Sequence, residues 1–168
     1  MAMTSYEWRN LPEETRRLIQ NNQQDVPVKA SGLAKVLGVS VVASTLPAGI
    51  SGEIRPVPGR NGEFFIKVNR HDSPRRQRFT VAHELGHFLL HRDQIRDGIR
   101  DDVLYRSNLS DRREAEANRI AADLLMPEPL MREWIEQARI LQVEDTVAYL
   151  AERFDVSESA MKIRLGLG

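Results

Sequence analysis

The middle of the chain reads Arg78-Phe79-Thr80-Val81-Ala82-His83-Glu84-Leu85-Gly86-His87-Phe88-Leu89-Leu90-His91. It contains the pattern H-E-x-x-H, in which the first two histidines are four residues apart. Residues at this spacing lie on the same face of an α-helix, about one turn apart. His83 and His87 can therefore offer imidazole nitrogens to one metal ion, while Glu84 can reach a water molecule on the open side of that ion.

The alternative interpretation is an amphipathic core helix with incidental histidines. Three of the four histidines of the chain fall in this stretch, which favours the metal site. Gly86 costs a helix about 1 kcal/mol relative to Ala. That cost indicates that another element approaches the helix closely at Gly86.

The segments before the histidines predict how this helix begins and what it packs on. Ser73 is typical of an N-cap and Pro74 of a first helical residue, so we expect a helix from there to about His91. Three runs rich in β-branched residues, separated by Pro- and Gly-containing turns, predict strands at 39–44, 52–57 and 63–69. They would form a small, mostly antiparallel sheet, and the strand at 63–69, if it lies at an edge, could align an extended substrate.

The rest of the chain predicts further helices, and hence an α+β fold. Residues 1–9 have the composition of a loosely held terminus, and residues 93–110 are polar and irregular. Helices are expected near 12–23, 30–37, 111–125, 130–139, 144–154 and 157–165. We divide the chain into an N-terminal helix within 1–24, a core over 25–140 and a C-terminal helical pair over 141–168, all packed as one compact domain.

Composition narrows the class of protein. The 168 residues have a formal net charge of zero, which does not favour nucleic acid or an acidic membrane surface as partner. There is no cysteine, which excludes disulfides and thiolate zinc sites. No apolar run approaches the roughly 20 residues that span a bilayer, and the N-terminus lacks the layout of a signal peptide. A cytoplasmic location is expected.

A catalytic zinc site needs a third protein ligand. His91 is the nearest further histidine, but on a continuous helix it lies about 12 Å along the axis from His83. One ion cannot bind both ends of that span together with His87. His91 is therefore predicted to be a supporting or structural residue and not a ligand.

An acid on the helix at 111–125 is the better candidate for the third ligand. Glu114 and Asn118 are four apart and share a face, so Glu114 could bind the ion while Asn118 hydrogen-bonds a ligating histidine and fixes its tautomer. Glu116 points roughly 200° away around the helix. It is the weaker alternative and is expected to be a solvated surface acid.

The two helices together resemble the ImmA/IrrE metallopeptidases. The family pattern R-F-T-x-A-H-E-x-G-H matches the stretch quoted first. Its second pattern, E-x-x-A-N-x-F-A-x-x-L-L-M-P, matches Glu114-Ala115-Glu116-Ala117-Asn118-Arg119-Ile120-Ala121-Ala122-Asp123-Leu124-Leu125-Met126-Pro127, except for Ile120 where the family usually has Phe. The resemblance covers roughly residues 25–165. It implies a zincin-like (gluzincin-type) core, Glu114 as third ligand, and Zn²⁺ as cofactor, with Mn²⁺ as the alternative ion.

The chemistry expected of such a site is peptide hydrolysis. Zinc would lower the pKa of a bound water to near 7, and Glu84 would take the proton as the water attacks a carbonyl. A second donor to the oxyanion is usually required. Tyr105 is the candidate for that role because it lies in the loop between the two metal-binding helices.

The resemblance implies a substrate, and two other functions compete with it. Family members cleave helix-turn-helix repressors (Xre/cI-type), which relieves repression in mobile elements, phage or stress-response operons; such a repressor, encoded nearby, is the expected partner. One alternative is a zinc-bearing interaction module, or a toxin-like partner of an antitoxin repressor, with little turnover. The other is DNA binding through residues 147–165, which have helix-turn-helix spacing. Three basic residues between 152 and 164 are balanced by three acidic ones, so direct DNA binding is not expected.

Overall fold

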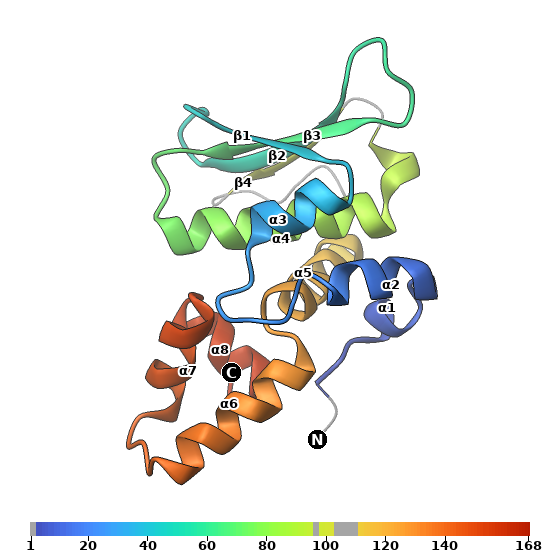
Figure 1. Cartoon of the computed structure of the whole chain (residues 1–168). Coiled ribbons are helices and arrows are strands. Elements are labelled where there is room, and N and C mark those ends of the chain that lie inside the picture. Colours follow the sequence, from blue (N-terminus) through green and yellow to red (C-terminus); the bar gives the residue numbers. More distant parts are fainter. Residues whose placement is uncertain (1–2, 96–97, 103–110) are drawn as a thin grey trace.

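The computed structural model describes residues 3–95, 98–102 and 111–168. Its centre is a layered arrangement of a sheet, the histidine helix and a second helix (Figure 1). The helix α4 (Pro74–Leu90) lies under one face of the sheet, beside α3 (Ala30–Val36), and α5 (Asp111–Leu125) crosses on the other side of α4. This sandwich buries α4 continuously from Thr80 to Phe88, so that His83, Glu84 and His87 lie in the interior of the protein.

The three predicted strands are present, and a fourth joins them. The sheet has the order β1 (Ser40–Ser44), β3 (Phe64–Asn69), β2 (Ile50–Pro56), β4 (Ile99–Asp102). β1 pairs with β3 in parallel, whereas β2 pairs antiparallel with β3 and with β4. The prediction of three strands was therefore one short, because β4 reads Ile99-Arg100-Asp101-Asp102 and gives no apolar alternation to recognise.

The prediction that the strand before the histidine helix could be a free edge is wrong. β3 lies between β1 and β2, and Ile66 at its centre is fully buried. Its backbone groups are committed to two neighbours. In the described part of the chain the outer strands of the sheet are β1 and β4.

The helix α4 begins as its sequence predicts. Ser73 adopts an extended backbone, and its Oγ accepts a hydrogen bond from the Arg76 N–H at 3.3 Å. Pro74 follows as the first helical residue. The helix ends at Leu90, and the His91 N–H still donates to the His87 carbonyl at 2.7 Å. The histidines at 83 and 87 thus share one face.

Glycine allows both neighbours to approach α4. A Cβ on Gly86 would lie 2.9 Å from the Ala117 carbonyl oxygen of α5, and a Cβ on Gly52 of β2 would lie 2.4 Å from Thr80 Cγ2. Neither contact leaves room for a methyl group. The predicted close approach at Gly86 is confirmed, and the approaching element is the helix that carries Glu114.

Shorter helices surround this centre. They are α1 (Tyr6–Arg9), α2 (Glu13–Gln20), the 3₁₀ turn η1 (Arg92–Gln94), α6 (Glu128–Ile140), α7 (Thr146–Phe154) and α8 (Glu158–Arg164). Phe154 of α7 and Met161 of α8 are fully buried in the same apolar cluster as α4 and α5. The division of the chain into 1–24, 25–140 and 141–168 stays a prediction.

The N-terminal segment is fixed to the protein, contrary to the expectation of a loose terminus over residues 1–9. Ser5 caps α1 and also donates through its backbone N–H to Asp123 Oδ1 at 3.3 Å, while the Trp8 side chain is buried. The Arg164 guanidinium reaches the same carboxylate from α8, at 3.1 Å. One buried acid of α5 therefore joins both ends of the described chain.

Arg78, in the N-terminal half of α4, also joins segments that are far apart in the sequence. Its guanidinium donates to the carbonyls of Val28, Phe154 and Asp155 at 2.7, 3.2 and 3.1 Å. It thereby holds the C-terminal end of α7 against α4. Among the described residues, no helix combines the length and the apolar character that crossing a membrane requires.

Candidate metal centre

Two histidines and an acid gather on the buried face of α4. His83, Glu84 and His87 are all buried, and each offers a ligand atom within 4.8 Å of the others. The helical spacing alone explains this gathering, since positions 83 and 87 are one turn apart. The face points toward α5.

The helix α5 adds a second carboxylate to this group. Glu114 Oε2 lies 3.1 Å from His83 Nε2, and Glu114 Oε1 lies 2.9 Å from His87 Nε2. The two Nε2 atoms are themselves 3.1 Å apart. Zinc with bonds of about 2.0–2.1 Å in a tetrahedron separates its ligand atoms by about 3.3 Å. The three groups are thus spaced close to what one such ion requires.

A contact from Asn118 fixes which nitrogen of His83 carries its proton. His83 Nδ1 lies 2.8 Å from Asn118 Oδ1. An amide oxygen only accepts, so Nδ1 donates, and in the neutral ring the lone pair is on Nε2, the nitrogen that faces Glu114. This is the contact that the shared face of positions 114 and 118 led us to expect.

Burial sets the protonation state of His87. Its side chain is fully buried, and this desolvation lowers the pKa of His87 to about 4. Glu114 works in the opposite direction, while His83 and His91 add to the lowering. The imidazole is therefore neutral at pH 7 and has a lone pair for an electrophile.

Glu84 is the most unusual group of the cluster. It is fully buried, and among the described residues neither of its carboxylate oxygens has a hydrogen-bond partner. A buried, unpaired carboxylate costs several kcal/mol. Buried polar groups are rarely left without a hydrogen-bond partner, and a metal-bound water beside Glu84 would be such a partner. The donor set and the orphaned acid both fit a metal ion.

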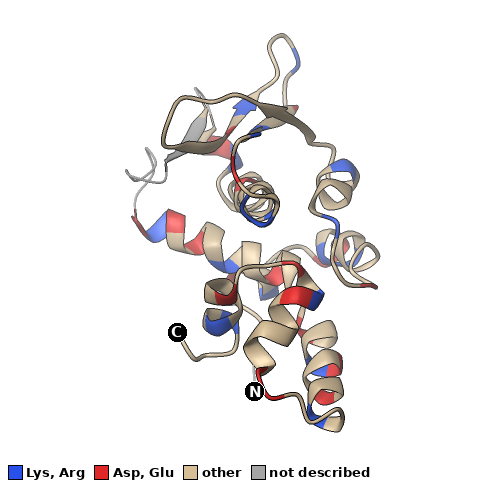
Figure 2. Ribbon diagram, turned by 90° about the vertical axis from the view of Figure 1, so that its left-hand side faces the viewer, with Lys and Arg blue, Asp and Glu red and all other residues tan. Residues whose placement is uncertain are grey.

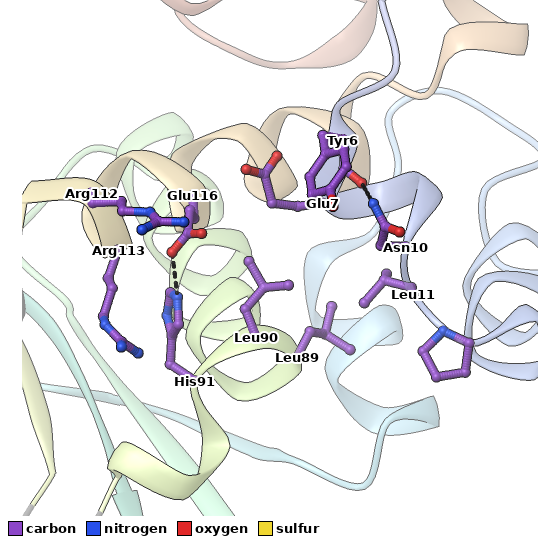
Figure 3. A pocket seen from close by; sticks show the side chains of 11 residues that line it. Tyr6, Glu7, Asn10, Leu11, Leu89, Leu90, His91, Arg112, Arg113 and Glu116 are labelled. Atoms are coloured by element: carbon purple, nitrogen blue, oxygen red, sulfur yellow. Dashed lines mark hydrogen bonds and ion pairs between the residues drawn. The ribbon is translucent and has the colours of Figure 1, made fainter.

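His91 lies behind His87, away from Glu114. The two Nδ1 atoms are 3.0 Å apart, and His91 Nε2 lies 3.1 Å from Glu116 Oε1. The expectation that Glu116 is a solvated surface acid is wrong, because its half-buried side chain faces His91 (Figure 3). A helical wheel gives the direction of Cβ only, and a long glutamate can bend back toward α4 from either flank of α5. Sequence reasoning missed this pair.

Tyr105, the predicted oxyanion donor, lies outside the described residues. Its role stays a prediction. The arrangement that is described can bind a divalent ion and can accept a proton beside it.

Comparisons with known proteins agree with this geometry. The model of a peptidase family, described as the IrrE N-terminal-like domain, matches residues 34–166. The radiation response metalloprotease IrrE of Deinococcus radiodurans is 36% identical over an alignment of 133 residues, which covers 69% of this chain and 37% of that protein. The present chain thus spans well under half of that relative.

A solved structure extends the comparison of the fold. The Mycobacterium tuberculosis transcriptional regulator matches with a TM-score of 0.52 at 21% identity, over 96% of this chain and 49% of the other. At this identity the likeness concerns the fold. The likeness extends over nearly the whole of the present chain.

Proposed function

This chain belongs to the metallopeptidase family of the IrrE N-terminal-like domain, and from that premise we propose that it is a zinc-dependent endopeptidase that cleaves a helix-turn-helix repressor. One observation carries the proposal. Two histidines of α4 and a glutamate of α5 converge within about 3 Å of one another beside a buried, unpaired carboxylate.

His83, His87 and Glu114 would hold the ion. Two neutral imidazoles and one carboxylate are a common ligand set of catalytic zinc, and Mn²⁺ is the alternative that the same ligands accept. When bound, zinc supplies Lewis-acid chemistry, acidifying a water and polarising a carbonyl. Asn118 orients His83 through Nδ1, and His91 does the same for His87.

Glu84 would move the proton. Its oxygens have no competing donors among the described residues, so they are available to accept a proton from the attacking water. The same oxygen can then deliver that proton to the amine that leaves when the peptide bond breaks. Burial keeps bulk water away from this exchange.

The identity of the substrate is inferred from the family resemblance of the two motifs. The chain spans 37% of the IrrE relative. A repressor encoded beside this gene is the expected partner. Cleavage would remove the DNA-binding activity of the repressor and so relieve repression of the operon.

The test is cleavage of the neighbouring repressor by the purified, zinc-loaded protein. Glu84→Gln should lower the cleavage rate by about 10²–10⁴-fold, since the amide cannot take the proton. Glu133→Gln, on the exposed side of α6, is the matched control and should cleave like the wild type. Equal cleavage by Glu84→Gln would refute the assignment of the base. Repressor binding without cleavage, with zinc present, would favour the interaction module instead.

DNA binding through α7 and α8 receives little support from the side chains. The Arg164 guanidinium is buried against Asp123, and that of Arg153 lies over the rings of Tyr149 and Trp134 at 4.8 and 5.7 Å. Lys and Arg are interspersed with Asp and Glu along these helices (Figure 2). A phosphate backbone requires a positive face that this segment does not offer.

A further inference from the structure

A row of hydrogen bonds leads from the surface to the proposed ligand His87. It begins at Glu116, whose Oε1 lies 3.1 Å from His91 Nε2. It continues through the His91 ring, whose Nδ1 lies 3.0 Å from His87 Nδ1. The opposite nitrogen of His87 faces Glu114 at 2.9 Å. Figure 3 shows the outer half of this row, where His91 rises from the end of α4 toward Glu116 of α5.

The direction of the protons along this row follows from the chemistry of imidazole. A neutral ring has one N–H and one lone pair. If His87 gives its Nε2 lone pair to a metal, its proton is on Nδ1 and must be donated to His91 Nδ1. The proton of His91 is then on Nε2 and is donated to the Glu116 carboxylate. Every donor in the row then has one acceptor.

Exposure falls along the row in the same direction. The side-chain exposures are 24% for Glu116, 4% for His91 and 0% for His87. Glu116 belongs to the wall of a cavity of about 450 Å³ at the ends of α4 and α5, together with Leu89, Leu90 and Arg112 (Figure 3). Glu116, the charged end of the row, is therefore in contact with solvent, while the two imidazole rings are almost fully buried. This arrangement avoids the cost of burying an isolated carboxylate.

The second histidine of the proposed metal set has a different partner. His83 donates to a neutral amide oxygen, that of Asn118, at 2.8 Å. His87 reaches a carboxylate, through His91. Hydrogen bonds to ionised acceptors are roughly twice as strong as those between neutral groups. A carboxylate behind a ligating histidine fixes its tautomer and makes it a better ligand.

We propose that Glu116 is a positioning residue for the metal centre, acting through His91 to hold and strengthen His87 as a ligand. The proposal rests on the proposed function only in that His87 binds the ion. It gives the two glutamates of α5 different roles. Glu114 faces the ion directly, and Glu116 acts on it from two imidazoles away.

The test is the zinc affinity of the full-length chain, measured by competition with a chromophoric chelator. Glu116→Gln keeps the shape and removes the charge, and it should raise the Kd for zinc by about 10–100-fold. Glu133→Gln should leave the Kd unchanged. Glu116→Asp should recover part of the affinity. The metal-free forms of wild type and Glu116→Gln should unfold at similar urea concentrations, which distinguishes positioning of a ligand from general stabilisation.

A double-mutant cycle asks whether Glu116 acts through His91. In the His91→Leu background, Glu116→Gln should have no further effect on the Kd, because the row is already broken. An unchanged Kd in Glu116→Gln, or the same fold-change with and without His91, would overturn the proposal. Absence of zinc binding by the wild type would instead refute the proposed function. The wild-type titration thus distinguishes the two failures.

Discussion

Two buried carboxylates, one on α4 and one on α5, differ in what surrounds them. Asp123 accepts from the guanidinium of Arg164 at 3.1 Å, and both Ser5 groups, the backbone N–H and the hydroxyl, donate to it. Glu84 is buried as deeply, yet its oxygens have no partner among the described residues. The first cluster supplies its own cation, while the second brings acids and imidazole rings together.

The difference teaches how to tell a structural buried charge from a functional one. Around Asp123 the charges cancel, and the contacts join residues from both ends of the chain. Glu84, by contrast, has no hydrogen-bond partner for either carboxylate oxygen among the described residues, and its neighbours in the cluster are imidazole rings. A buried carboxylate without a partner of its own indicates a site for a ligand. The donor set of His83, Glu84 and His87 fits a metal ion as that ligand.

The largest effect on stability is expected when the cation is removed from the cluster around Asp123. Arg164→Met removes the cation beside Asp123, together with hydrogen bonds to the carbonyls of Met3 and Met126. A buried acid left without its partner costs about 3–5 kcal/mol of unfolding free energy. Urea titration would measure this loss.

A second substitution checks the cause of that loss. Asp123→Asn added to Arg164→Met removes the unpaired charge and should restore part of the stability. If the double variant is no more stable than Arg164→Met, packing of the arginine stem matters more than charge, and the contrast with Glu84 weakens.

The cluster around Glu84 should lose stability as the pH falls below neutral. Burial lowers the pKa of His87 from 6.5 in the unfolded chain to about 4. Between these values the unfolded chain binds more protons, so the stability due to neutral His87 is complete above pH 6.5, falls as the pH drops, and is lost by about pH 4. At 1.36 kcal/mol per unit, the metal-free protein should lose about 2 kcal/mol from this group between pH 7.5 and 5.

Unfolding of the metal-free protein at several pH values tests this prediction. His87→Phe should flatten the profile between pH 7 and 5. His71→Gln is the matched control, because His71 is exposed and its ring lies 3.3 Å from the Thr45 hydroxyl on the surface. If His87→Phe leaves the dependence of unfolding free energy on pH unchanged, other groups cause the loss of stability at acidic pH.

The smallest effect on stability should come from Glu84, although its effect on cleavage is large. Glu84→Gln replaces a buried, unpaired charge by a neutral amide, so the unfolding free energy of the metal-free protein should stay equal or rise by up to about 1 kcal/mol. A loss of 2 kcal/mol or more in urea would mean that Glu84 has a structural partner, and the comparison with Asp123 would fail.

Local patterns predicted the centre of the molecule well. Ser73 and Pro74 marked the start of α4, and the spacing of His83 and His87 put both rings on one face. Gly86 signalled a close neighbour, which proved to be Ala117 of α5. These features depend on residues within a few positions of one another, where backbone preference and helical period decide the outcome.

Features that depend on long-range pairing were not predictable in the same way. β4 is polar and short, so it became a strand only because β2 offers it a hydrogen-bonding edge. The parallel pairing of β1 with β3, which buries β3, follows from the crossover and not from either sequence. The contact of Glu116 with His91 needed the crossing of α4 and α5, which a single helical wheel does not contain.

The central claim is that His83, His87 and Glu114 together hold one ion beside Glu84. Zinc content per chain, by elemental analysis after dialysis against metal-free buffer, tests it most directly in wild type, Glu114→Ala and the exposed control Glu133→Ala. One zinc per chain is expected in the wild type and in Glu133→Ala, with a large loss in Glu114→Ala, because only the last removes a carboxylate that touches both imidazoles. Full zinc content in Glu114→Ala, or none in the wild type, would contradict the account.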